Sequence, residues 1–135
     1  LVPAKVIAPD EVPDKEYPFV LTTGRLLEHW HTGSMTMRAS ILNAIEPEPY
    51  VHVSNKDMRK NNLSQNEIVQ LSTRRGKVDV KVRFDRMIPE GMVFMPFCYE
   101  NAPVNLLTNQ ALDPDGKIPE LKYCAAKINK VTEKV

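Results

Sequence analysis

The stretch that decides the fold is IVQLSTRRGKVDVKVRF, residues 68–84. From Lys77 to Phe84, every second residue is a valine or phenylalanine, and each residue between them is charged. This period of two places alternate side chains on opposite faces of a β-strand. Because Arg74–Gly76 interrupts the pattern, we expect a hairpin here. Phe84 should point inward with the valines, and Gly76 should take a positive φ in the turn.

Shorter elements flank this hairpin. We expect strands at residues 19–22, 50–53, 92–95 and 122–131, a weak helix at 35–45, and a helix that begins with the capping box at 54–57. Pro89–Gly91 should form a type I turn. Residues 97–121 should be irregular, with a possible helical turn at 105–111. The economical packing is a mainly β, closed and mostly antiparallel barrel with small helices, because closure removes edge strands.

Composition bounds the class of protein. The chain has 135 residues, 42% hydrophobic and 26% charged, and a net charge of +1. Such a charge gives no general electrostatic reason to expect nucleic acid or an anionic membrane as partner. No apolar run approaches the roughly 20 residues of a membrane helix, so we expect no membrane insertion. Because the first residue is Leu1, we interpret residues 1–16 as a lead-in from a preceding domain and 17–135 as the barrel domain.

The two cysteines, Cys98 and Cys124, are too few for a disulfide framework and have no CxxC spacing. We expect both to be buried in a reducing compartment, since free cysteine is among the most buried residue types. No signal peptide is visible. We therefore predict a cytoplasmic location.

Chemistry-bearing residues concentrate in one stretch, TTGRLLEHWHT, residues 22–32. It contains the only tryptophan and two of the three histidines. A strand that ends in such a loop offers N–H groups, hydroxyls and the Arg25 guanidinium to an anionic or hydrogen-bond-rich ligand. The alternative is a strand end capped by hydroxyls, with Arg25 in a surface ion pair. Asn105 similarly suits either a heterocycle edge or a turn, and Lys122 alone is typical of a solvated side chain.

A metal site is one way to use the histidines. His29 and His31 stand two apart and would share one side of a strand, and His52 could complete three imidazoles for zinc. However, the sequence has no paired cysteines, no His-Glu-x-x-His and no evident carboxylate to orient a ligand. We predict no protein-ligated metal, with His52 as a half-exposed strand residue.

Nucleophilic catalysis lacks its signatures as well. Neither Ser34 nor Ser40 lies in a Gly-x-Ser-x-Gly elbow, and Cys98 has no adjacent base. There is also no GxGxxG after a strand and no phosphate-binding loop. The residues alone therefore argue against a self-contained hydrolase and predict a β-rich ligand-binding domain.

Five segments, in this order, resemble one family. They are TGRLLEHWHTGSMT (23–36), STRRGK (72–77), PEGMVFMPF (89–97), NLLTNQALDP (105–114) and KIPELKYCA (117–125). They resemble the C-terminal domain of molybdopterin-dependent oxidoreductases. The resemblance spans about residues 17–131. Its last two segments are more similar to formate dehydrogenase α subunits than to periplasmic nitrate reductases.

The resemblance implies a double-psi β-barrel of the aspartate-decarboxylase-like kind, which closes over a bis(molybdopterin guanine dinucleotide) cofactor (bis-MGD) with molybdenum or tungsten. By motif, the main cofactor-contacting loop would be Thr23, Gly24, Arg25, Leu26, Leu27, Glu28, His29, Trp30, His31 and Thr32. Arg25 would supply charge or donors, and the last four would lie against the pterin system. Leu26 and Leu27 would contribute mainly backbone.

Three further positions carry over by motif. Asn105 and Lys122 match two more cofactor contacts, and Phe97 matches an aromatic residue near the substrate side. The resemblance places no catalytic residue and no metal ligand in this chain, because the metal's cysteine or selenocysteine and the iron–sulfur clusters belong to other domains. Cys98 and Cys124 match neither role.

The whole enzyme would then oxidise formate to carbon dioxide. Its partners would be the remaining domains of the same catalytic subunit and electron-transfer subunits, and the isolated domain would be inactive. Two alternatives stay open: the same domain of a nitrate reductase or another family member, and an interaction barrel without a cofactor.

Overall fold

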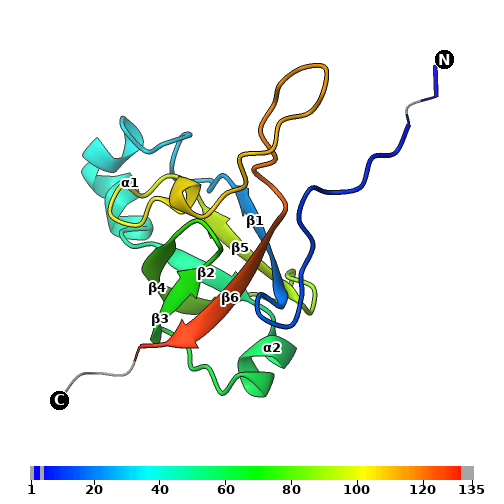
Figure 1. Cartoon of the computed structure of the whole chain (residues 1–135). Coiled ribbons are helices and arrows are strands. Elements are labelled where there is room, and N and C mark those ends of the chain that lie inside the picture. The colour runs from blue at the N-terminus through cyan, green and yellow to red at the C-terminus, as the bar shows by residue number, and fades with distance from the viewer. Residues whose placement is uncertain (1, 4, 132–135) are drawn as a thin grey trace.

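The computed structural model describes residues 2, 3 and 5–131. Its centre is a closed barrel with the strand order β1-β5-β2-β4-β3-β6 (Figure 1). The strands are β1 (Phe19–Gly24), β2 (Tyr50–Val53), β3 (Ile68–Ser72), β4 (Lys77–Phe84), β5 (Met92–Pro96) and β6 (Cys124–Lys130). The helices are short: η1 (Thr36–Arg38), α1 (Ser40–Ile45), α2 (Asn55–Lys60) and η2 (Val104–Leu106). The predicted mainly β barrel with small helices is confirmed.

Closure depends on β6. Phe19 of β1 pairs with Ala126, and Ser72 of β3 pairs with Lys127, both in antiparallel register. Two neighbouring pairs, β1 with β5 and β2 with β4, are parallel although their strands are not consecutive. The other pairs are antiparallel. This mixed, crossed arrangement is the double-psi form implied by the resemblance, and an up-and-down barrel would not produce it.

The hairpin of β3 and β4 is confirmed, with a register that runs from Ile68 opposite Lys81 to Ser72 opposite Lys77. The three valines of β4 are buried in the hydrophobic core. The expectation for Phe84 is wrong, because its side chain is 46% exposed. Phe84 is the last residue of β4 and pairs with Val53, the last residue of β2, so it lies at the rim of the barrel.

Two glycines behave differently from the sequence prediction. Gly76 does not have the predicted positive φ. It is needed for space, since a Cβ there would lie 2.8 Å from the carbonyl oxygen of Leu106 in the long loop. Gly91 has a φ of 78° at the third position of a turn closed by a 3.2 Å bond from Met92 N–H to Pro89 O. A positive φ there belongs to a type II turn rather than the predicted type I turn.

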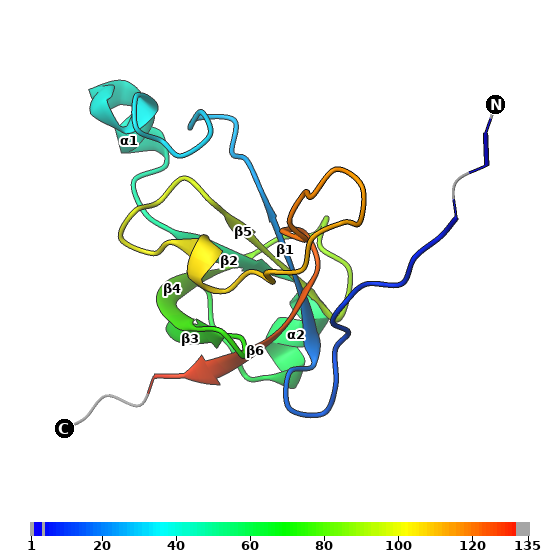
Figure 2. The same ribbon diagram turned by 45° about the horizontal axis from the view of Figure 1, so that its top comes forward.

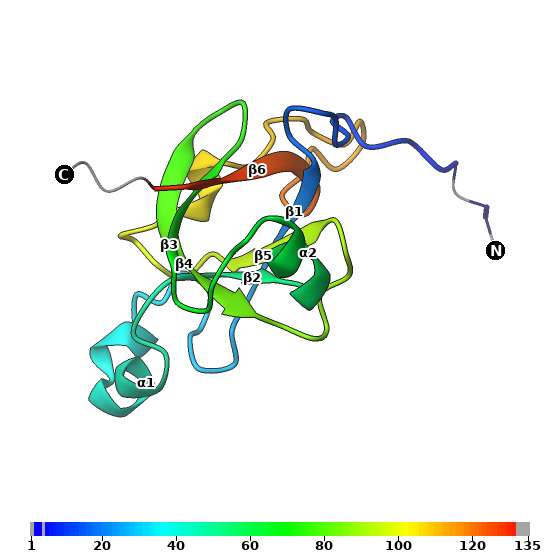
Figure 3. The ribbon, with the colours of Figure 1, turned by 90° about the horizontal axis from the view of Figure 1, so that it is seen from below.

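The predicted cap of α2 by Ser54 is confirmed, although Asp57 accepts from the Ser54 hydroxyl rather than from its backbone N–H, and the cap also holds the next strand. The Asp57 N–H donates to Ser54 Oγ at 3.1 Å, and the Ser54 hydroxyl donates to Asp57 Oδ2 at 2.7 Å. The same carboxylate oxygen accepts the N–H of Gly91 at 2.9 Å, so α2 fixes the turn that begins β5. Asn62 ends the helix with a φ of 52°, as asparagine often does. Figure 3, seen from below, shows α2 across this end of the barrel.

The opposite end of the barrel carries the long irregular segments. Residues 25–46, which include η1 and α1, and residues 97–121, which include η2, both extend from the end away from α2 (Figures 1 and 2). The predicted irregular stretch is confirmed, although its helical turn is at Val104–Leu106 rather than 105–111. The last strand begins at Cys124, two residues later than predicted.

The N-terminal lead-in is attached to the barrel through Glu11. Its carboxylate accepts hydrogen bonds from Arg74 at 2.6 Å, from Arg75 at 2.8 Å and from the N–H of Ala125 at 2.9 Å. Arg75 also donates to the carbonyl of Leu107 in the long loop. Burial by itself raises the pKa of the Glu11 carboxyl. The hydrogen bonds that it accepts outweigh this effect, and the pKa lies below the usual 4.5.

We expect Glu11→Gln to destabilise the 135-residue chain by about 1–3 kcal/mol, because charge-assisted hydrogen bonds are lost from a largely buried group. Urea denaturation measures this free energy of unfolding. The matched control is Glu16→Gln, whose exposed pair with Lys127 should contribute under about 1 kcal/mol.

The effect should also depend on pH in one direction. Since the folded-state pKa of Glu11 lies below the unfolded value of 4.5, its stabilisation is present above that pH and is lost as the pH falls through the folded pKa. The difference between the wild-type chain and Glu11→Gln should therefore shrink in acid. A difference that stays constant between about pH 3 and pH 7 would contradict this assignment.

Candidate functional site

The predicted loop begins where β1 leaves the barrel. Gly24 pairs with Pro96 in the parallel register of β1 and β5, and its carbonyl accepts the N–H of Phe97 at 3.2 Å. A Cβ on Gly24 would lie 2.7 Å from the ring of Phe94, so only glycine fits there without displacing the ring. The two strands therefore deliver residues 25–32 and Phe97 to the same rim.

Lys122 and Thr23 tie the segment before β6 to the start of this loop. The Lys122 ammonium donates to the carbonyl of Thr23 at 2.9 Å. In return, the Thr23 hydroxyl donates to the carbonyl of Leu121 at 2.8 Å. Asn105 is exposed on η2 and lines, with Leu121, an open hollow of about 520 Å³. The structure thus brings Thr23 and Lys122 together, although they are far apart in sequence, while Asn105 lies across a hollow from Leu121, the residue before Lys122.

Arg25, Trp30, His31 and Phe97 form a continuous row at the rim. The Arg25 guanidinium lies 5.6 Å from the centre of the Trp30 ring, within range of a cation–π contact. The Trp30 and His31 ring centres are 4.6 Å apart, and those of His31 and Phe97 are 6.4 Å apart. Trp30 is 59% exposed, and His31 has a φ of 47°. We name these four residues the rim row.

The rest of the loop is divided between surface and interior. Leu27 is 97% exposed and Thr32 is exposed, whereas Leu26 and Glu28 are half-buried. His29 is different again, because its side chain is only 1% exposed. Its Nε2 lies 2.7 Å from the carbonyl of Glu46 and its Nδ1 lies 3.3 Å from the Thr36 hydroxyl. The ring of His29 therefore faces the protein interior.

The three histidines do not meet. His52 is 9% exposed, with Nδ1 3.0 Å from Asp85 and its ring centre 5.3 Å from that of Phe94. The prediction of a half-exposed His52 is therefore wrong, because β2 lies between two strands and its neighbours cover the ring. Burial lowers the pKa of His52 below the usual 6.5, although the hydrogen bond to Asp85 opposes this shift. Among residues 2, 3 and 5–131, no three His, Cys, Asp or Glu side chains are grouped to hold a metal ion.

Both cysteines are buried, as predicted. Cys98 is 1% exposed and lies under a hollow of about 520 Å³ that Gly33, Ser34 and Met37 also line. Burial raises the pKa of the Cys98 thiol to about 11. A thiol that stays protonated at neutral pH is a poor nucleophile and a poor metal ligand. The geometry gives Cys98 a packing role.

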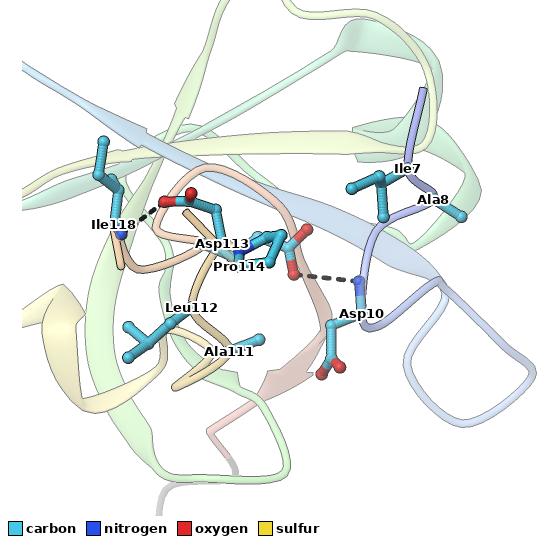
Figure 4. A pocket seen from close by; sticks show the side chains of 9 residues that line it. Ile7, Ala8, Asp10, Ala111, Leu112, Asp113, Pro114 and Ile118 are labelled. Carbon is cyan, nitrogen blue, oxygen red and sulfur yellow. Dashed lines mark hydrogen bonds between the residues drawn. The ribbon is translucent and has the colours of Figure 1, made fainter. Parts of the chain in front are cut away.

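Another hollow, of about 580 Å³, lies between the lead-in and the long loop (Figure 4). The N–H of Asp10 donates to Glu120 across it at 3.2 Å, and Asn109 donates to Asp10 at 3.0 Å. Ile7 and Ile118 give it an apolar lining. No residue that the sequence predicts to contact the cofactor lines this hollow.

With the geometry in hand, comparison with known proteins identifies the family. The family model described as "Molydopterin dinucleotide binding domain" matches residues 19–125. The chain belongs to this family. The match includes β1 to β5, the rim row, Asn105 and Lys122.

Two known proteins are similar to the chain in sequence over most of its length. The chain is 45% identical over 121 residues to the F420-dependent formate dehydrogenase subunit alpha of Methanocaldococcus jannaschii, covering 90% of this chain and 18% of that one. It is also 45% identical over 123 residues to the F420-dependent formate dehydrogenase 1 subunit alpha of Methanococcus maripaludis, covering 91% and 18%. The chain thus spans under a fifth of the length of these relatives.

A solved structure shares the fold. Acetylene hydratase from Pelobacter acetylenicus superposes with a TM-score of 0.79 at 22% identity, over 87% of this chain and 19% of that one. At this identity the likeness shows the fold alone. Within the described residues, no helix has both the length and the apolar character to cross a bilayer.

Sequence reasoning missed the residues that hold the loop in place. Thr36 and the carbonyl of Glu46 both bond to the His29 ring, and the Tyr99 hydroxyl donates to the same carbonyl. Leu121 supplies a carbonyl to Thr23. Spacing gives no signal for them, because three of these contacts use main-chain carbonyls that any residue provides. Only the fold shows which carbonyls lie near His29, Tyr99 and Thr23.

The burial of the cysteines has a simple test. In the native 135-residue chain at neutral pH, we expect no rapid reaction with a thiol reagent such as a chromogenic aromatic disulfide, because both thiols are covered and protonated. In denaturant, the same chain should release the equivalent of two thiols, which is the control. Rapid labelling of one thiol in the folded chain would contradict the assigned burial.

Proposed function

We propose that this chain is the cofactor-binding domain of a formate dehydrogenase catalytic subunit and contributes to a site for bis-MGD. The observation that carries the proposal is the 45% identity to two formate dehydrogenase alpha subunits over at least 90% of the chain. Family membership supports a molybdopterin dinucleotide cofactor of some kind. The same identity favours formate over nitrate as the substrate.

The donors at the rim fit such a cofactor chemically. Among the residues that the structure describes, Arg25 forms no ion pair with a carboxylate, so its guanidinium is available to a phosphate group. The Lys122 ammonium uses one proton on Thr23 and keeps two more donors. Trp30 offers an exposed ring face, and Asn105 an exposed amide that can donate and accept. These groups suit pyrophosphate and polar heterocycles.

The roles of individual residues follow from where they lie. We assign Arg25, Asn105 and Lys122 to direct contacts with the cofactor, and Trp30, His31 and Thr32 to contacts with the pterin system. Thr23, Gly24, Leu26, Leu27 and Glu28 contribute mainly backbone. Phe97, next to His31 in the rim row, is assigned to the substrate side. His29, with its ring buried, supports the loop rather than touching the cofactor.

When bound, the cofactor supplies a metal, molybdenum or tungsten, that takes two electrons from formate as carbon dioxide and a proton are released. This chain supplies binding and orientation, because its apolar core makes the barrel a rigid support for the rim that faces the cofactor. The metal's protein ligand and the iron–sulfur clusters belong to the remaining domains of the subunit. Electron-transfer subunits are the further partners, and the cytoplasm is the proposed location. The isolated domain is expected to be inactive.

We expect Arg25→Ala in the full-length subunit to lower the content of pterin and metal, because a donor to the cofactor is removed. Elemental analysis and pterin fluorescence after extraction measure both. Arg59→Ala is the matched control, since Arg59 is exposed on α2 at the other end of the barrel. Circular dichroism of the 135-residue variants checks that the barrel still folds.

Unchanged pterin content, metal content and turnover in Arg25→Ala would sink the cofactor assignment and favour an interaction barrel. The substrate is tested separately, by assaying the intact enzyme with formate and with nitrate. Because both relatives are F420-dependent, F420 is the first electron acceptor to supply in the formate assay. Turnover of nitrate without turnover of formate would overturn the choice of substrate.

A further inference from the structure

We propose that Glu46 and Arg83 are positioning residues that fix Trp30 through a directed hydrogen-bond network with His29 and Thr36. None of the four belongs to the rim row. The inference rests on the proposed function in one respect only, that the face of Trp30 meets the cofactor. The network itself is a property of this chain and can be tested without any cofactor.

Glu46 joins three segments of the chain. Its carbonyl accepts from His29 Nε2 at 2.7 Å and from the Tyr99 hydroxyl at 3.1 Å. Its carboxylate accepts from both terminal nitrogens of Arg83 on β4, at 2.8 and 3.0 Å. The Arg83 guanidinium in turn lies 3.8 Å from the centre of the Tyr50 ring on β2. The far end of the 25–46 segment is thus bound to the barrel wall by a bidentate ion pair.

The protons in this network have one consistent direction. A carbonyl can only accept, so His29 carries its proton on Nε2 and donates to Glu46. In the neutral ring, Nδ1 is then an acceptor, and it faces the Thr36 hydroxyl at 3.3 Å. That hydroxyl also accepts the backbone N–H of Trp30 at 3.0 Å. The chain of donors therefore runs from Trp30 through Thr36 and His29 to Glu46.

The 25–46 segment has few other supports. Neither η1 nor α1 contains a buried residue, so packing of these helices contributes little to fixing the segment. Ile41 and Ile45 of α1 are 76% and 57% exposed. His29, by contrast, is 1% exposed, and the Tyr99 ring lies edge-on with its centre 5.9 Å away. A fully satisfied polar network in a buried position is rigid, and here it replaces a hydrophobic anchor.

The consequence reaches the whole rim row. The backbone of Trp30 is held by Thr36, and the ring of Trp30 contacts the Arg25 guanidinium and the His31 ring. Arg83 and Glu46 therefore set the orientation of ligand-facing side chains without facing the ligand. This separates them from an ordinary surface ion pair, whose loss would leave Trp30 unaffected.

Trp30 is the only tryptophan of the 135-residue chain, so its fluorescence reports this position directly. In Thr36→Val, which removes the acceptor of the Trp30 N–H, we expect exchange of that amide with solvent to rise about tenfold. Acrylamide quenching of Trp30 should rise as well. Thr36→Ser restores the hydroxyl and should return both measurements to wild-type values.

Arg83→Met should change Trp30 in the same direction, because it releases the carboxylate of Glu46. Arg59→Met, on α2, is the matched control and should leave Trp30 unchanged. If Arg83→Met fails to fold, Glu46→Gln keeps the backbone acceptor and nearly the same shape while weakening the ion pair. The proposal would be overturned if folded Thr36→Val kept the wild-type values of Trp30 amide exchange and acrylamide quenching, and if folded Arg83→Met or Glu46→Gln kept them as well.

The full-length subunit separates this inference from the proposed function. Thr36→Val should lower pterin and metal content, and Thr36→Ser should restore them. If Arg25→Ala leaves cofactor content unchanged while Trp30 responds to Thr36→Val, the cofactor role fails and the positioning network stands. If Arg25→Ala lowers cofactor content while Trp30 does not respond, the cofactor role stands and the network is refuted.

Discussion

The closure of the barrel by β6 is the constraint on which the rest of the molecule depends. This strand satisfies the otherwise open edges of β1 and β3 at once, so no strand edge in the described barrel is left to pair with another chain. A closed barrel of six strands is narrow, so side chains fill its interior and leave no room for a ligand. A large cofactor has to be bound outside the barrel, at one of its ends.

The two ends carry different kinds of structure. At one end, the buried carboxylate of Asp57 joins α2 to the turn before β5, which makes a compact floor. At the other end, the parallel neighbours β1 and β5 finish side by side and continue into long segments. Parallel neighbours deliver their carboxyl ends to the same edge, and this geometry brings the Trp30 loop next to Phe97. The candidate ligand-binding residues therefore lie at one rim. The contacts that stabilise the fold lie in the barrel core and at the end closed by α2.

The sequence was sufficient to predict the elements whose formation depends on residues close together in the chain. The alternation in β4 predicted the hairpin, and Ser54 with Asp57 predicted the start of α2. It was insufficient where burial depends on partners far along the chain. His52 is covered because β2 lies inside the sheet, and His29 because Glu46 and Tyr99 come from other segments. No periodicity reveals which strands run parallel, so the double-psi topology came from family resemblance alone.

Gly76 shows the same limit in another form. Its place in a tight hairpin suggested a requirement for unusual backbone angles. The actual requirement is the close approach of the Leu106 carbonyl, which belongs to a loop thirty residues later. The candidate site could be proposed in outline from the sequence, because its residues are chemically conspicuous. The groups that support it, such as Thr36 and Glu46, are common residues in ordinary positions, and only the fold connects them to Trp30.

Most tethers of the rim, by which we mean the hydrogen bonds that hold its segments in place, have a main-chain carbonyl as their acceptor. His29 and Tyr99 donate to the carbonyl of Glu46, Thr23 to that of Leu121, and Lys122 to that of Thr23. A carbonyl acceptor is retained whatever side chain is attached to it, so substitution can remove the donor of such a tether but not its acceptor. Two of the three acceptor residues, Glu46 and Thr23, also use their side chains, so Leu121 is the acceptor whose side chain is free to change while its tether is kept.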